Sequence, residues 1–285
     1  MGERTETWTV RRVLEWATAD FRGRELDSPR LDAELLLASA LKCTRLDLYT
    51  GMDRPLEPSE LAAYRKAIAR RRQREPVAHI VGEKEFWSLA FEVTPDVLVP
   101  RPDTETLVDA ALHAGPGARL HDLCTGSGCA AIAIASERPE LVVDAVDVSP
   151  AAVAVARRNA ARHGLESRVT VHGGDLYAPL PEGARYSMIV SNPPYVPDAE
   201  IDGLAAEVRR EPRLALAGGA DGLDVVRRIL AGAPRFLAPG GAVLLEIDPR
   251  QAAAVSQKIG SEALGVCGEV VRDLAGQERV VVFRT

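Results

Sequence analysis

The stretch that decides the fold is LHDLCTGSGCAAIAIA, residues 120–135. An apolar run leads into a glycine-rich turn, and small apolar residues then continue as in a buried helix. Gly126 and Gly128 let the backbone pass close to a ligand at the carboxyl end of the first strand. Together with Ala131 they also satisfy the dinucleotide-binding fingerprint, so this loop alone does not identify the ligand, and a purely structural turn stays open.

Strands and helices alternate downstream of this loop. Strands are predicted at 118–124, 141–147, 168–172, 186–191, 242–247, 264–271 and 279–284, and helices at 128–137, 149–163, 222–237 and 249–259. Such alternation predicts an α/β fold with a doubly wound, mostly parallel sheet of seven strands. The last two strands are joined too closely for a right-handed crossover, so we expect them to pair antiparallel.

Upstream of the loop the pattern is different. Residues 1–75 are predicted to be helical because apolar residues recur at helical spacing. They carry 15 basic and 13 acidic side chains, which gives this segment a net charge of +2 and residues 76–285 a net charge of −8. This difference in charge supports a domain boundary near Pro76. The cations between Arg65 and Arg74 are interpreted as a solvated helix end, with an electrostatic docking patch as the alternative. From Val77 to Val93 the period changes to two, which predicts a hairpin turning at Gly82-Glu83.

Composition excludes several classes of protein. The chain has 285 residues, 46% hydrophobic and 27% charged, which rules out disorder and fibrous repeats. Its net charge of −6 has the wrong sign for a protein held on nucleic acid by phosphate contacts. We find no signal peptide or membrane-spanning run and therefore expect a cytoplasmic protein without membrane attachment. The four cysteines lack zinc-binding spacing, so no metal is expected.

Two carboxylates follow the next strands. Asp147 ends the second strand, 21 residues after Gly126, where it can accept hydrogen bonds from both hydroxyls of a ribose. Its alternative role as a helix cap is already filled by Ser149. Asp175 follows the third strand and is placed to accept from an adenine amino group, while Leu176 can pack on the ring. An ordinary Asx turn is the alternative for Asp175.

The motif that discriminates best is Asn192-Pro193-Pro194-Tyr195, directly after the apolar strand 186–191. Two prolines lock φ and remove two backbone donors, which leaves a rigid surface made mainly of acceptors. The Asn192 side-chain oxygen and the Pro193 carbonyl can each accept one N–H of a substrate amino group. The Tyr195 ring can stack on the planar group that carries this nitrogen. The alternative is a coincidental turn.

These residues resemble the S-adenosylmethionine-dependent methyltransferases with a Rossmann-like seven-stranded sheet, whose NPPY subgroup alkylates nitrogen on planar groups. Within it, the chain is similar to the peptide chain release factor glutamine N5-methyltransferase family. The similarity runs nearly from end to end, through EPVAHIVGEKEFWSLAFEV (75–93), LVPRPDTETLV (98–108), DLCTGSG (122–128), VDVSPAAVAVARRNA (146–160), NPPYV (192–196), EPRLALAGGADGLD (211–224) and LLEIDPRQ (244–251).

The resemblance implies a complete assignment of the site. Cofactor contacts fall on Cys124, Thr125, Gly126, Ser127, Gly128, Asp147, Asp175, Leu176 and Asn192, and substrate contacts on Asn192, Pro193, Pro194 and Tyr195. S-adenosylmethionine is the implied cofactor and S-adenosylhomocysteine its product. The implied substrate is the glutamine in the Gly-Gly-Gln motif of class 1 release factors. Cys124 stands where the family usually has glycine, and we favour simple packing there over a narrowed pocket.

The expected organisation is a helical substrate-docking domain at 1–75, a β-hairpin linker with a connecting helix at 76–116, and a methyltransferase domain at 117–285, acting as a monomer. The nearest rival is an adenine-N6 methyltransferase, because adenine also presents a planar amino group to such a motif. That enzyme needs base flipping and a basic groove, which the net charge disfavours. Two further alternatives are a dehydrogenase, which would share the glycine fingerprint, and a cofactor-binding module without catalytic activity. Neither assignment explains the NPPY motif.

Overall fold

The computed structural model describes residues 7–115 and 117–285 and divides the chain into two compact units. The smaller unit runs to Gly82 and also contains Ala206–Arg210, while the larger unit comprises Glu83–Ala205 and Glu211–Thr285. The sequence placed this boundary near Pro76. It lies later because the short helix α5 (Val77–Val81) packs on helices of the smaller unit.

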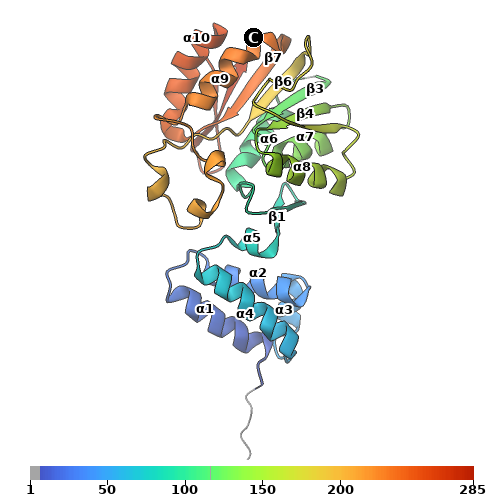
Figure 1. Cartoon of the computed structure of the whole chain (residues 1–285), viewed down its shortest axis with the longest axis vertical. Helices are drawn as coiled ribbons and strands as arrows, with labels where there is room; N and C mark the ends of the chain where they lie inside the picture. The colour runs from blue at the N-terminus through green and yellow to red at the C-terminus, as the bar shows by residue number, and fades with distance from the viewer. Residues whose placement is uncertain (1–6, 116) are drawn as a thin grey trace, which may run out of the picture. The chain divides into compact units, whose positions relative to one another are not determined.

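The smaller unit is helical, as the apolar spacing predicts (Figure 1). Its core is a single cluster in which Phe21, Leu36 and Tyr64 are almost fully buried. The Tyr64 hydroxyl donates to the Ala33 carbonyl at 3.1 Å, which satisfies its polar end. The helices around this core are α1 (Val10–Arg22), α2 (Pro29–Leu41), α3 (Arg45–Thr50), α4 (Pro58–Arg72) and α5.

The cations at the end of α4 form a network of ion pairs. Arg71 is 5% exposed and donates to Asp32 at 2.7 Å and to Glu207 at 2.9 Å, all within the smaller unit. Arg70, Arg72 and Arg74 also pair with carboxylates of this unit. The interpretation as a simple solvated helix end is therefore wrong for Arg71, because this side chain is buried. Its carboxylate partners compensate the cost of burying a guanidinium.

The hairpin lies further along the chain than predicted. Its strands are β1 (Glu83–Phe86) and β2 (Leu89–Glu92), and they pair antiparallel around Trp87 and Ser88, which have φ values of 51° and 57°. Gly82, with a φ of 84°, ends α5 instead of forming the turn. A left-handed glycine suits either role, and the sequence pattern did not distinguish a helix end from a turn.

The larger unit contains the predicted seven-stranded sheet, in the order β5-β4-β3-β6-β7-β9-β8. Figure 1 labels four of its neighbouring strands, β4, β3, β6 and β7. The first five strands in this order are parallel, and the antiparallel pairing of β8 with β9 is confirmed. The strands are β3 (Arg119–Leu123), β4 (Val142–Asp147), β5 (Val169–Gly173), β6 (Tyr186–Ser191), β7 (Leu237–Glu246), β8 (Glu269–Arg272) and β9 (Glu278–Arg284).

Helices cover both faces of this sheet because successive side chains of each strand point to opposite sides. Leu120 belongs to a core shared with α6 (Glu105–Leu112), α7 (Cys129–Glu137) and α8 (Pro150–Arg162). Leu123 belongs to the core beneath α9 (Asp224–Gly232) and the segment before α10 (Gly260–Leu264). The α/β class is therefore confirmed. It brings the ends of β3, β4 and β6 to one edge.

Several element boundaries differ from the sequence prediction. The strand expected at 242–247 already begins at Leu237, and the helix expected at 249–259 is a 3-10 turn followed by a π-helical segment, Ala254–Ile259. The strand expected from residue 264 begins only at Glu269, because α10 extends to Leu264 and Gly265, with a φ of 72°, ends it. The helix expected over 222–237 stops at Gly232, before a 3-10 turn that contains Pro234. Within residues 7–115 and 117–285, no helix is long and apolar enough to span a membrane.

Candidate active site

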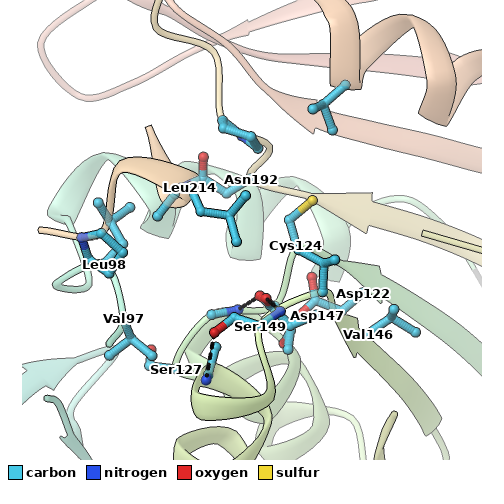
Figure 2. Close-up of a pocket in the computed structure, with 18 of the residues that line it drawn as sticks. Val97, Leu98, Asp122, Cys124, Ser127, Val146, Asp147, Ser149, Asn192 and Leu214 are labelled. Carbon is cyan, nitrogen blue, oxygen red and sulfur yellow. Dashed lines mark hydrogen bonds between the residues drawn. The ribbon is translucent and has the colours of Figure 1, made fainter. Parts of the chain in front are cut away.

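A cavity of about 390 Å³ opens at the carboxyl ends of β3, β4 and β6, within the larger unit (Figure 2). This volume falls in the range of small-molecule sites, roughly 300–1,000 Å³. Most of the residues predicted from the sequence line it. They are Cys124, Thr125, Gly126, Ser127, Asp147, Asp175, Leu176, Asn192 and Pro194, whereas Gly128, Pro193 and Tyr195 are not part of its wall.

The glycine loop is held by its own backbone. The Thr125 N–H donates to the Val146 carbonyl at 3.0 Å, and Gly126 has a φ of 56°. Gly128 has a φ of 81°, and a Cβ there would lie 3.1 Å from Ile132 Cδ1 and 3.3 Å from Ala156 Cβ. Gly128 thus allows α7 to pack closely on α8, and the loop before it faces the cavity.

Behind the loop, Asp122 is 1% exposed and accepts a hydrogen bond from the Thr125 hydroxyl. Burial raises the pKa of Asp122 to about 7, against the lowering effect of that hydrogen bond. Asp122 and Thr125 both line the cavity. The pair therefore combines a buried acid with a fixed hydroxyl beneath the ligand-facing loop.

Asp147 connects the glycine loop to the next helix. Its Oδ2 accepts from the Gly126 N–H at 2.8 Å, and its Oδ1 accepts from the Ser149 N–H at 2.9 Å. Burial raises the pKa of Asp147, and these backbone donors oppose the rise. The Ser149 hydroxyl caps α8 by accepting from the Ala152 N–H. Each carboxylate oxygen keeps a lone pair that can accept from a ribose hydroxyl.

The two residues after β5 differ in environment. Asp175 has a side chain that is 55% exposed, and its Oδ2 forms an ion pair with Arg228, which also lines the cavity. Leu176 is 9% exposed with a φ of 49°, an uncommon backbone conformation for leucine. An apolar wall therefore lies beside a carboxylate that is already paired, and an adenine amino group would compete with Arg228 for Asp175.

Within NPPY, only Asn192 and Pro194 reach the cavity, as Figure 2 shows for Asn192. Asn192 Nδ2 donates to the Thr104 hydroxyl at 3.1 Å. The Tyr195 hydroxyl donates to Glu246 Oε1 at 3.4 Å. The expected stacking of the Tyr195 ring on a substrate therefore stays a prediction, since its hydroxyl is directed toward the end of β7.

A second loop holds the NPPY backbone. Val196 and Ala217 are joined by a short parallel bridge, in which the Gly218 N–H donates to the Val196 carbonyl at 2.9 Å. Gln251 Nε2 donates to the Tyr195 carbonyl at 2.9 Å. A Cβ on Gly222 would lie 2.2 Å from that same carbonyl oxygen, so only glycine fits there. These contacts show that residues 211–224 and 244–251 help to hold the NPPY backbone in place.

Several residues in and around the site were not singled out by sequence reasoning, among them Thr104, Glu246 and Glu211. Thr104 lines the cavity, Glu246 is 1% exposed beside Tyr195, and Glu211 accepts from the Val99 N–H at 3.0 Å and from Arg101. All three lie in segments that carry the family resemblance. The family resemblance of these segments could have pointed to these residues, whereas no local sequence motif marks them.

Cys124 occupies a position suited to glycine. Its φ is 58°, and its side chain lines the cavity. Burial raises the pKa of the Cys124 thiol to about 12, and the same holds for Cys129. Both thiols are therefore protonated at neutral pH and act as small apolar groups in the wall of the cavity.

Comparison with known proteins covers nearly the whole chain. A family model described as the PrmC N-terminal domain matches residues 12–82, and one described as the Methyltransferase small domain matches residues 102–211. A release factor glutamine methyltransferase of Geobacter sulfurreducens is 47% identical over 90% of this chain and 89% of that protein. One from Rhodopirellula baltica is 41% identical over 96% of this chain and 95% of that protein.

Solved structures share the fold of the larger unit. A 16S rRNA methyltransferase of T. thermophilus, solved with AdoMet and guanosine, has a TM-score of 0.54 at 19% identity and covers 71% of this chain and 49% of that one. A methyltransferase from Pyrococcus furiosus has a TM-score of 0.51 at 20% identity and covers 68% of this chain and 87% of that one. At this level of identity the likeness concerns the fold alone.

Proposed function

The chain belongs to the release factor glutamine methyltransferase family, and on that premise we propose that it methylates the side-chain amide nitrogen (N5) of the glutamine in the Gly-Gly-Gln motif of class 1 peptide chain release factors. The enzyme is a methyltransferase that uses S-adenosylmethionine and releases S-adenosylhomocysteine. The observation that carries the proposal is a single cavity that combines the glycine loop, Asp147 and Asn192.

The residues present fit this cofactor. The loop from Cys124 to Ser127 lines the cavity and leaves room for the methionine part, and Asp147 offers two carboxylate oxygens to the ribose. Leu176 supplies an apolar surface for the adenine, with Asp175 at its edge. When bound, S-adenosylmethionine supplies a methyl group activated by a sulfonium centre.

The chemical problem is the nucleophile. An amide nitrogen reacts poorly because its lone pair is delocalised into the carbonyl, so the protein has to align this nitrogen for in-line attack. Asn192 Oδ1 and the Pro193 carbonyl are proposed to accept the two N–H bonds of the glutamine amide. Both acceptors bind more strongly as positive charge builds on nitrogen, which stabilises the transition state more than the ground state.

The scheme requires no dedicated base. The alkylated amide nitrogen is positively charged and acidic enough to lose its proton to water. The rigid Pro193-Pro194 pair contributes by holding the acceptors in place, and Tyr195 is proposed to pack against the planar amide. Catalysis then rests on positioning and on preorganised acceptors.

An adenine-N6 substrate is the second candidate, since adenine presents the same kind of planar amino group. Its requirement for a basic groove does not agree with the net charge of −6. The two relatives described above, whose matches to this chain cover 89% and 95% of their own length, are named for release factors. The protein substrate is therefore favoured.

The test is to offer labelled S-adenosylmethionine with full-length release factor, a Gly-Gly-Gln peptide, free glutamine and an adenine-containing oligonucleotide side by side. We expect transfer to the release factor, mapped by mass spectrometry to the glutamine, and very poor transfer to free glutamine, which lacks remote binding energy. Transfer to the oligonucleotide, or equal modification of a release factor carrying Gln→Glu, contradicts the substrate assignment.

We further propose that the protein acts as a monomer in the cytoplasm. One chain carries both the proposed cofactor contacts and Asn192 in the wall of this cavity, between Asp96 and Arg228. The helical smaller unit is proposed to be a docking domain for the release factor, and the methyltransferase domain to extend from about residue 117 to the end of the chain. Sedimentation at micromolar concentration tests the oligomeric state.

A further inference from the structure

Behind the NPPY motif lies a layer of polar groups that the reaction scheme above does not use. Thr104 is 3% exposed and Glu246 is 1% exposed. They are far apart in the sequence, since Thr104 lies just before α6 and Glu246 at the end of β7. Burying a carboxyl group and a hydroxyl in an apolar sheet is costly unless both are hydrogen-bonded. Their partners therefore indicate what the layer holds in place.

These partners are the two polar side chains of NPPY. Asn192 Nδ2 donates to the Thr104 hydroxyl at 3.1 Å. Thr104 in turn interacts with the Glu246 carboxyl and lowers its pKa, against the effect of burial. Tyr195 donates its hydroxyl to Glu246 Oε1 at 3.4 Å. The buried Glu246 carboxyl thus accepts directly from Tyr195 and is linked to Asn192 through its interaction with Thr104, while its Oε2 has no hydrogen-bond partner among the described residues.

The orientation of the Asn192 amide is the important consequence. An asparagine side chain has a donor end and an acceptor end that differ only by a rotation of 180°. With Nδ2 committed to Thr104, Oδ1 is left as the acceptor for a substrate N–H. Without this bond the amide can rotate, and a donor would then face the donors of the substrate.

We propose that Thr104 and Glu246 are positioning residues that fix the acceptor end of Asn192 toward the substrate nitrogen. The inference rests on the proposed function, in which Asn192 accepts from the reacting amide. Thr104 does so directly and Glu246 through Thr104, while Glu246 also holds the hydroxyl of Tyr195. Burial raises the pKa of Glu246 to about 7, and the hydrogen bonds from Thr104 and Tyr195 oppose this.

The first test compares Thr104→Val with Thr104→Ser. Valine keeps the shape but cannot accept from Asn192, whereas serine keeps the hydroxyl. We expect kcat for release factor methylation to fall about 10- to 100-fold in Thr104→Val, with the KM for release factor and the Kd for S-adenosylmethionine within about threefold of wild type. Thr104→Ser should recover most of the lost kcat.

The exposed Thr170 on β5 provides the matched control, since Thr170→Val makes the same substitution away from the cavity and should leave kcat unchanged. Thermal unfolding of each variant separates a positioning effect from misfolding. If Thr104→Val keeps kcat within threefold, or loses S-adenosylmethionine affinity instead of kcat, the positioning role is wrong. Equal losses in Thr104→Ser and Thr104→Val also overturn it.

Glu246→Gln supplies the second variant. Its side chain has the same shape but can turn an N–H toward the hydroxyls of Thr104 and Tyr195, so we expect a smaller loss, about three- to tenfold in kcat. Little further loss is expected when Glu246→Gln is combined with Thr104→Val, because both act through Asn192. If the fall in kcat of the double variant equals the product of the two single-variant effects, the two residues act independently and the proposal is contradicted.

Failure of the proposed function can be distinguished from failure of this inference. Wild-type protein that methylates an oligonucleotide and not the release factor would refute the substrate assignment, and the same variants measured on that substrate still test the orientation of Asn192. Wild-type activity on release factor together with unchanged kcat in Thr104→Val would refute the inference alone.

Discussion

The Asp147 carboxylate accepts a hydrogen bond of 2.8 Å from the backbone N–H of Gly126, 21 residues earlier in the chain. Asp147 is the residue predicted to bind the ribose. One oxygen of its carboxylate therefore already fixes the glycine loop, and the other accepts from the Ser149 N–H at the start of α8. The proposed cofactor site is consequently held together by hydrogen bonds within the protein itself. Preorganisation of this kind lowers the entropic cost of binding.

Replacing Asp147 by alanine should weaken S-adenosylmethionine binding. The variant loses hydrogen bonds between a charged group and the ligand, worth about 1.5–3 kcal/mol or roughly 10- to 150-fold in Kd, and also releases the Gly126 N–H. Titration calorimetry measures the change. Asp175→Ala, at an exposed carboxylate paired with Arg228, should have a smaller effect. Wild-type affinity in Asp147→Ala would remove this residue from the site.

Asn192→Ala should reduce the chemical step by about 100- to 1,000-fold, equivalent to roughly 2.7–4 kcal/mol, because it removes one of two preorganised acceptors. Single-turnover methylation of release factor at saturating S-adenosylmethionine measures this rate. The Kd for S-adenosylmethionine is measured separately because Asn192 lines the same cavity. A rate within threefold of wild type would exclude the acceptor role.

Gly128→Ala should destabilise the protein by about 1–3 kcal/mol more than Gly183→Ala. The two glycines have φ values of 81° and 79°, so the cost of the backbone conformation is the same. At Gly128 the new methyl meets Ile132 and Ala156 at 3.1 and 3.3 Å, whereas at Gly183 it meets nothing within 4 Å. Denaturant unfolding compares the two variants, and equal losses would argue against tight packing of α7 on α8.

Stability should fall as the pH decreases from about 6.5 to about 4, in part because of His121. This side chain is fully buried, and burial lowers its pKa to about 4. The unfolded chain therefore takes up a proton that the folded chain refuses, which costs up to about 3 kcal/mol across this interval. In His121→Gln the free energy of unfolding should vary less with pH than in the wild type.

The cysteines should differ in their reaction with iodoacetamide. At pH 8 a thiol with a pKa of about 12 is ionised in roughly one molecule in 10,000, so Cys124 and Cys129 should resist alkylation in the folded protein. Cys267 is exposed and should react first. Peptide mass mapping after a short exposure identifies the modified sites. Early labelling of Cys124 would show that its environment is not that of a buried thiol.

The sequence by itself determined the order of elements in the larger unit and the edge at which the ligand-facing residues gather. Alternating apolar runs and a glycine turn specify parallel strands with helices between them, and the carboxyl ends of β3, β4 and β6 must then meet. Asp147 and Asn192 follow directly from this logic, because each comes immediately after a buried strand or at its last residue.

Only the tertiary structure decided how these side chains are held. The bonds from Asn192 to Thr104 and from Tyr195 to Glu246 join residues 88 and 51 positions apart, and no local spacing predicts such pairs. The predicted role of Gly82 in a hairpin turn was wrong for the same reason, since a left-handed glycine ends a helix as readily as it turns a hairpin. Local propensity selects the conformation of a segment, but long-range packing selects its partners, and those partners orient the acceptor on which the proposed chemistry depends.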